Sequence, residues 1–192
     1  MSEVIEAGPS PSSPAENIIS AKVIIAGGMD SSKADFVNAI SELGSLTAET
    51  EPKDGDLSSN RPVLMDFGRI SVADDLILYL FGTPGQTRLW FMWDELFRGA
   101  IGTVVLVDTQ RLAESLDAVR FLEHRGLAYV IAAEAPDFTV RVDPQAVRDA
   151  LAIAPDVPVL SVNPRRRESV KAAIVALVDY ATHRLRRGER PA

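Results

Sequence analysis

Short apolar runs and amphipathic stretches alternate along most of the chain. Runs of β-branched and aliphatic residues predict strands at residues 18–25, 63–70, 75–82, 101–108, 127–133 and 157–162. Apolar residues spaced three or four apart predict helices at residues 31–43, 111–125, 144–153 and 169–187, and a loop with a helix at 83–98. Strands that alternate with helices predict an α/β fold: about six mostly parallel strands, with helices on both faces. The adjacent strands between residues 63 and 82 predict one antiparallel edge strand.

Polar segments mark the limits of the predicted domain. Residues 1–16 are rich in Pro, Ser and Glu and predict a disordered tail, because they have little apolar surface to bury. Residues 17–188 then form one domain of ordinary size, and residues 189–192 form a short C-terminal tail. Residues 44–61 are polar and have no apolar period, which predicts a long loop of the kind that usually has a function.

Composition excludes several classes of function. The chain of 192 residues has no cysteine, so it has neither disulfides nor thiolate metal ligands. A net charge of −7 argues against general nucleic-acid binding, which depends on basic patches. The longest apolar runs are too short to span a bilayer, and the first residues lack the apolar region of a signal peptide. We therefore expect a cytoplasmic protein.

The turn after the first predicted strand has the spacing of a phosphate-binding loop. Gly27 and Lys33 stand at the G-x-x-x-x-G-K spacing, in which backbone N–H groups wrap phosphates and the lysine reaches the outer ones. Ser32 replaces the second glycine, and Ala34 replaces the hydroxyl residue that holds Mg²⁺. The position between a strand and a helix supports this interpretation more than the pattern does. The loop residues expected at a nucleotide are Gly27, Gly28, Ser31, Ser32, Lys33, Ala34 and Asp35.

A second segment with candidate chemistry follows the strand at residues 75–82. Gly82 and Gly85 can offer backbone N–H groups to a terminal phosphate, and Gln86 is the candidate catalytic residue that would orient a water molecule. These residues follow a predicted strand, where phosphate-contacting segments of such folds are found.

An aromatic stretch comes directly after this segment. It contains both tryptophans of the chain, Trp90 and Trp93, with Phe91 between them. Aromatic side chains on a mobile helix suit a partner surface. The alternative is core packing of one helix face, because an amphipathic helix must bury something.

The strings MDFGRI (residues 65–70) and LILYLFGTPGQTRLWFMWDELFRGAIGTVVLVDTQRLAES (residues 76–115) resemble the small GTPases of actinobacterial conservons. These are relatives of the bacterial MglA GTPases encoded beside roadblock-domain proteins. The resemblance runs from about Lys22 to about His183. It implies a Ras-like P-loop fold, GTP or GDP as ligand, and a roadblock-type partner in a membrane-associated signalling complex. Asp137 matches the aspartate of the family's N-x-x-D base-reading motif, whereas Glu134 replaces its asparagine.

Departures from the family pattern predict a weakened site. Ala34 stands where the family carries a hydroxyl residue that holds Mg²⁺. Arg61 and Pro62 stand where it carries threonines, one of which also helps to hold the ion, so we expect Mg²⁺ to be weak or absent. Asp30 and Asp35 place carboxylates in an anion-binding loop. Like charges roughly 4 Å apart repel by about 4 kcal/mol at an effective dielectric near 20. Plain helix capping by these aspartates is the alternative.

Three functions remain open at this point. The first is a GTP-binding regulatory switch with impaired or absent hydrolysis, even if Gln86 positions water. The second is a nucleotide-free pseudo-GTPase that acts as a protein-interaction module. The third is ATP binding, because half of the base-reading motif is lost.

Overall fold

The computed structural model describes residues 18–28, 32–43, 46–50, 63–73, 75–84, 93–135 and 142–189, with the backbone alone described at 46–50, 63 and 64. The predicted N-terminal tail and most of the predicted loop at 44–61 lie outside these ranges.

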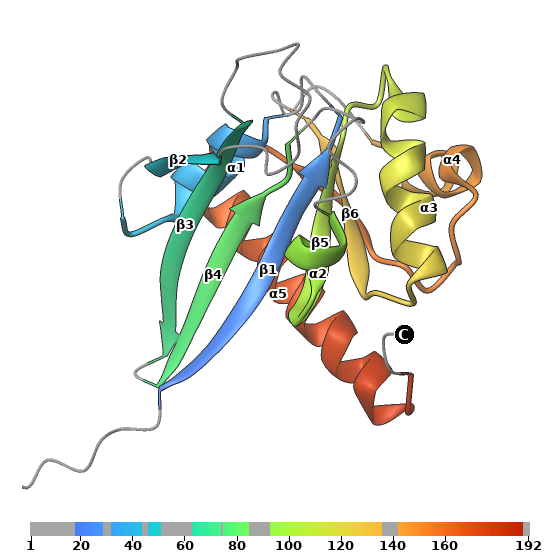
Figure 1. Cartoon of the computed structure of the whole chain (residues 1–192). Coiled ribbons are helices and arrows are strands. Elements are labelled where there is room, and N and C mark those ends of the chain that lie inside the picture. The colour runs from blue at the N-terminus through green and yellow to red at the C-terminus, as the bar shows by residue number, and fades with distance from the viewer. Residues whose placement is uncertain are drawn as a thin grey trace, which may run out of the picture.

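The described strands form one seven-stranded sheet in the order β2-β3-β4-β1-β5-β6-β7 (Figure 1). Their bounds are β1 (Ile19–Gly27), β2 (Leu46–Thr50), β3 (Val63–Ala73), β4 (Leu76–Gly82), β5 (Ala100–Val107), β6 (Tyr129–Glu134) and β7 (Val159–Val162). Strand β1 runs parallel to β4 and β5, and β6 runs parallel to β5 and β7. Strand β3 is antiparallel to both of its neighbours, β2 and β4. The α/β class and the mostly parallel sheet are therefore as predicted.

Strand β2 is the difference between the predicted and the observed sheet. Residues 46–50 fall in the segment predicted as a loop, yet they pair with β3 from Leu46↔Phe67 to Thr50↔Val63. Backbone hydrogen bonds to β3 are enough to form this strand, although its sequence has no apolar period. Strand β2 is consequently the outermost strand on this side of the sheet, and the antiparallel strand β3 is the second one.

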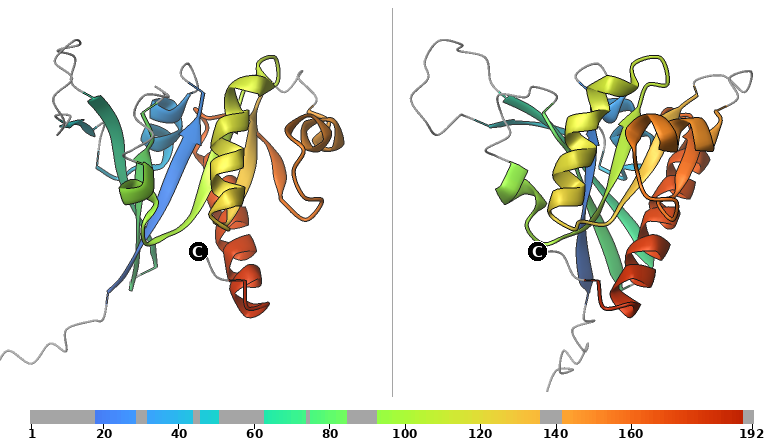
Figure 2. Two further views of the ribbon diagram at one scale, coloured as in Figure 1. Left: turned by 45° about the vertical axis from the view of Figure 1, so that its right-hand side comes forward. Right: turned by 90° about the vertical axis from the view of Figure 1, so that its right-hand side faces the viewer.

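Helices cover both faces of the sheet (Figure 2). Their bounds are α1 (Lys33–Ile40), α2 (Trp93–Phe97), the 3-10 helix η2 (Leu112–Ser115), α3 (Leu116–His124), α4 (Pro144–Leu151) and α5 (Arg167–Arg186). Helices α1 and α5 pack on one face against alternate strand residues such as Val23, Ile25 and Val130. Helices α2, α3 and α4 pack on the other face against residues such as Ile24 and Ile131. No helix in the described ranges has the length and apolarity that crossing a membrane requires.

The carboxyl ends of β1, β4, β5 and β6 meet at one edge of the sheet, because these strands are parallel. Ligands of open α/β sheets bind at this edge. Three of these strands end there at Gly27, Gly82 and Glu134, and Asp108 directly follows the end of β5.

Candidate functional site

The turn between β1 and α1 has the predicted strand-loop-helix arrangement. Strand β1 ends at Gly27, and α1 begins at Lys33 with Ser32 in the capping position. Asp30 and Ser31 lie outside the described residues, so the predicted roles of these two residues stay predictions.

Lys33 is the buried cation of this turn. Its side chain is only 6% exposed, and its ammonium Nζ donates to the carbonyl oxygen of Gly28 at 2.6 Å and to that of Gly27 at 3.5 Å. A charge removed from water needs such partners. The ammonium is thus held inside the loop, where a phosphate-binding lysine is expected, and in this state it bonds to the carbonyl groups of the loop itself.

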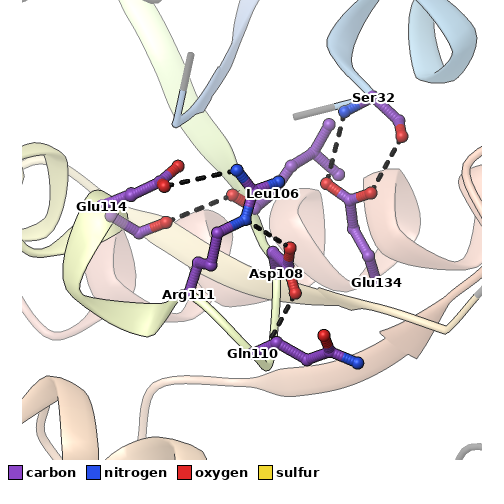
Figure 3. A network of polar contacts seen from close by, with 8 residues as sticks. Ser32, Leu106, Asp108, Gln110, Arg111, Glu114 and Glu134 are labelled. Atoms are coloured by element: carbon purple, nitrogen blue, oxygen red, sulfur yellow. Dashed lines mark hydrogen bonds and ion pairs between the residues drawn. The ribbon is translucent and has the colours of Figure 1, made fainter. Parts of the chain in front are cut away.

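Glu134, at the end of β6, bonds to the same loop (Figure 3). The backbone N–H of Ser32 donates to Glu134 Oε1 at 3.3 Å, and the Ser32 hydroxyl donates to Oε2 at 2.9 Å. The carboxylate therefore occupies two donors at the start of α1, one of which is a backbone N–H of the kind that a phosphate loop offers to its ligand.

A second carboxylate approaches the loop from η2 on the other side of β5's end. A Cβ added to Gly28 would lie 2.8 Å from Glu114 Oε2 and 3.2 Å from Glu114 Cβ, so a side chain at residue 28 would displace the Glu114 carboxylate. Arg111 connects Glu114 to Asp108, since its guanidinium donates to Glu114 Oε1 at 3.4 Å and to Asp108 Oδ2 at 2.9 Å (Figure 3). The N–H of Gln110 and the Arg111 guanidinium lower the pKa of Asp108. This network fixes Glu114 beside the loop.

Asp66 of β3 is a third carboxylate of the site. A Cβ added to Gly82 would lie 3.0 Å from Asp66 Oδ2, so Asp66 projects across the end of β4. Burial raises the pKa of the Asp66 carboxyl, and the Lys33 ammonium opposes that rise. Asp66 therefore shares a charge interaction with the lysine of the loop, and its oxygens could hold Mg²⁺, which binds proteins through one or two carboxylates together with substrate phosphates.

Asp35 forms an ion pair outside the loop. Its carboxylate accepts from Arg165 Nε at 2.8 Å, on the segment before α5, and both side chains are substantially exposed. Among the described residues, the Glu134 carboxylate bonds to Ser32, whereas Asp35 ties the first turn of α1 to the segment before α5. Ala34, next to it in α1, contributes no oxygen ligand.

Trp93 corrects the predicted partner surface. The side chain is 3% exposed and packs against the rings of Phe97 and Phe121, with ring centroids 5.4 and 5.2 Å apart. Helix α2 is amphipathic and turns this ring into the core, so the core alternative holds for Trp93. Trp90 and Phe91 lie outside the described residues, as do Gly85, Gln86 and Asp137.

The sequence interpretation missed Asp66 and Glu114, and it did not foresee the hydrogen bonds between Glu134 and Ser32. Asp66 interrupts an apolar strand, and this is the sequence signal that could have revealed it. In the sheet it lies near Gly82 of the neighbouring strand. Glu114 carries no such signal, because only the fold brings η2 to Gly28. Thr83, which follows Gly82, was also missed: its hydroxyl is buried and has no hydrogen-bond partner among the described residues.

The donor set fits a phosphate group only in part. The Lys33 ammonium and the N–H groups at the start of α1 favour an anion. The carboxylates of Glu134, Glu114 and Asp66 oppose it. A metal cation would reverse the effect of Asp66, because a carboxylate beside phosphate is then a ligand and no longer a repelling charge.

Comparisons with solved structures identify the fold. The chain is similar to the cytosolic domain of the T. maritima FeoB iron transporter in a GDP form, with a TM-score of 0.64 and 19% identity over 85% of this chain and 64% of that one. The chain thus spans less than two thirds of that domain. It is also similar to the G domain of the same transporter, with a TM-score of 0.62 and 20% identity over 85% of this chain and 99% of that one. The fold is therefore that of a Ras-like P-loop G domain.

Sequence comparisons identify a family. A search of curated proteins finds no match, so the resemblance to the conservon GTPases stays a prediction. The sequence model of one family matches residues 40–140, which is more than half of the chain and begins after the phosphate loop. The chain belongs to this family, whose description is "Conserved hypothetical ATP binding protein".

Proposed function

We propose that this protein is a GTP-binding-protein-like regulatory switch that binds nucleotide weakly and hydrolyses it slowly or not at all. The observation that carries the proposal is Lys33, a buried lysine held inside the turn between β1 and α1 of a G-domain fold. A buried ammonium at this point is a costly feature for a purely structural turn. It is the group that such a fold needs to bind a phosphate.

Slow hydrolysis follows from the groups around the loop. Phosphoryl transfer depends on a metal ion that neutralises developing charge and on a positioned water molecule. The side chain of Ala34 supplies no oxygen for the metal. Asp66, whose carboxylate interacts with Lys33, is then the candidate metal ligand among the described residues. Without a hydroxyl at residue 34, Mg²⁺ would have one protein ligand fewer than the family pattern supplies, which weakens its binding.

The second candidate is a nucleotide-free interaction module. It is favoured by the hydrogen bonds that join Ser32 to Glu134 and Lys33 to Gly28, because they satisfy loop donors without a ligand. In this case the surface of the protein would stay in one state.

The proposed partner is a roadblock-type protein of a cytoplasmic signalling complex that can sit at the inner face of the membrane. This part of the proposal rests on the resemblance to conservon GTPases alone. Calorimetric titration of the two purified proteins tests it, and an absence of binding in the presence and absence of GTP would remove it.

Thermal-shift titration with GTP, GDP and ATP, each with and without Mg²⁺, tests the nucleotide. A ligand that binds the folded state raises the melting temperature by mass action. A shift with GTP or GDP alone supports the switch. A shift with ATP alone would mean that the protein binds an adenine and not a guanine nucleotide, in agreement with the family description. No shift with any nucleotide leaves the nucleotide-free module.

A further inference from the structure

The amide and hydroxyl groups of Ser32 both donate to one carboxylate. The two bonds, at 3.3 and 2.9 Å, use both oxygens of Glu134 and join residues 102 positions apart in the sequence (Figure 3). A carboxylate that accepts two hydrogen bonds in this way resembles an edge of a phosphate group, with two oxygens directed at neighbouring donors.

The described residues on either side of Ser32 also have contacts within the protein. Lys33 Nζ bonds to the carbonyl oxygens of Gly27 and Gly28, and Glu114 lies against Gly28. A phosphate that enters the loop must therefore displace the Glu134 carboxylate from Ser32. This displacement lowers the affinity of the loop for anions.

We propose that Glu134 is an internal competitor of the ligand: its carboxylate takes the place of a phosphate oxygen at Ser32 and thereby weakens binding of phosphate ligands. The inference rests on the proposed function in one respect, that the turn between β1 and α1 is the ligand site. It adds a named competitor and predicts that the loop recovers affinity for anions when that competitor is neutralised.

The decisive variant is Glu134→Gln, because glutamine keeps the shape and one accepting oxygen while it removes the charge. The matched control is Glu123→Gln, since Glu123 accepts from Tyr129 at the opposite end of the same strand, at 2.9 Å.

Calorimetric titration with pyrophosphate measures the loop alone, because pyrophosphate has no base. We expect Glu134→Gln to bind about tenfold more tightly than the unsubstituted protein, equivalent to about 1.4 kcal/mol. We expect no change in Glu123→Gln. Equal affinity, or no binding by any of the three proteins at millimolar pyrophosphate, overturns the proposal.

A second measurement tests the contact without any ligand. Urea unfolding of Ser32→Ala, Glu134→Gln and the double variant forms a double-mutant cycle. We expect a coupling of about two- to tenfold in the unfolding equilibrium constant. The hydrogen bond from the Ser32 hydroxyl is lost in Ser32→Ala and weakened in Glu134→Gln. Strict additivity means that the contact is not formed in solution and overturns the proposal as well.

The two experiments separate this inference from the proposed function. Tighter pyrophosphate binding by Glu134→Gln without binding of GTP, GDP or ATP by either protein supports the competitor and removes the nucleotide switch. Nucleotide binding by the unsubstituted protein that Glu134→Gln leaves unchanged keeps the switch and removes the competitor.

Discussion

The middle of the sheet and its carboxyl edge, where the carboxyl ends of β1, β4, β5 and β6 lie, belong to the same strands but are stabilised by different interactions. In β6, Val130, Ile131 and Ala132 have no exposed surface, and they pack between helices on both faces. The last residue of the same strand, Glu134, is partly buried and bonds to Ser32 of the loop. The interior of the strand is held by burial of apolar area, whereas its end is held by a few polar contacts between segments far apart in the sequence.

This difference matters because burial and polar pairing respond to different changes. Apolar burial in the middle depends on volume and involves no titrating group. Among the described residues, the edge brings together the Lys33 ammonium, the start of α1 and the carboxylates of Asp66, Asp108, Glu114 and Glu134, so its state depends on charge. A ligand with its own charge can therefore change the edge while the middle of the sheet stays as it is.

Ile131→Ala should have the largest effect on stability. The residue is 0% exposed in the cluster beneath α2, α3 and α4, and such a truncation costs about 2–5 kcal/mol of unfolding free energy. Urea unfolding measures it. Ile18→Ala, at a residue that is 56% exposed, is the control and should change stability by less than about 0.5 kcal/mol. A similar loss in both variants would contradict the burial argument.

Lys33→Met should remove phosphate binding and cost less stability than the core variant. The carbonyl oxygens of Gly27 and Gly28 lose a charged donor, which costs about 1–3 kcal/mol. Pyrophosphate titration and urea unfolding report the two effects separately. Lys171→Met, at an exposed residue of α5, serves as the control. Retained pyrophosphate binding in Lys33→Met would show that the anion binds elsewhere.

Asp66→Asn should change how stability depends on pH. Burial raises the pKa of Asp66 above its ordinary value of 3.8, although Lys33 opposes the rise. The folded state then holds the proton more tightly than the unfolded state, so this group stabilises the fold at low pH, and that contribution is lost as pH rises through the raised pKa. The variant should therefore gain stability relative to the unsubstituted protein as pH increases from about 3 to about 7.

Urea unfolding at a series of pH values measures this difference. Asp117→Asn, at an exposed residue of α3, is the matched control. A difference between the Asp66 variant and the unsubstituted protein that grows toward low pH would reverse the sign and contradict the assignment.

Asp35→Asn should have the smallest effect. The ion pair with Arg165 lies at the surface, where its partners are 41% and 80% exposed, so it contributes about 0–1 kcal/mol. The contribution should shrink in high salt, which screens exposed charges. Unfolding at low and high ionic strength checks this, and a loss that persists in high salt would indicate that Asp35 has a role beyond the ion pair.

The sequence predicted the parts of the molecule that depend on local pattern. The apolar runs located β1, β5 and β6, and apolar spacing located α4, where Asp143 Oδ1 accepts from the N–H of Gln145 at the helix start. The strand-loop-helix turn with Lys33 was also located, because glycine and lysine spacing is a local signal.

The contacts of the site could not be predicted in the same way. The bond from Ser32 to Glu134 spans 102 residues, and the bond from Arg165 to Asp35 spans 130. Which carboxylate reaches the loop is decided by where the strands end, and no local period encodes that. Trp93 shows the converse, since an aromatic residue in a conspicuous string can face the core as easily as a partner.

The central claim is that the loop between β1 and α1 binds phosphate in competition with Glu134. Crystal structures of the protein alone and with GDP test it most directly. The account predicts that the free protein has the Glu134 carboxylate on the N–H and hydroxyl groups of Ser32, and that a phosphate oxygen replaces it in the complex. A complex in which GDP binds while Glu134 stays on Ser32, or a free structure without that contact, would contradict the account.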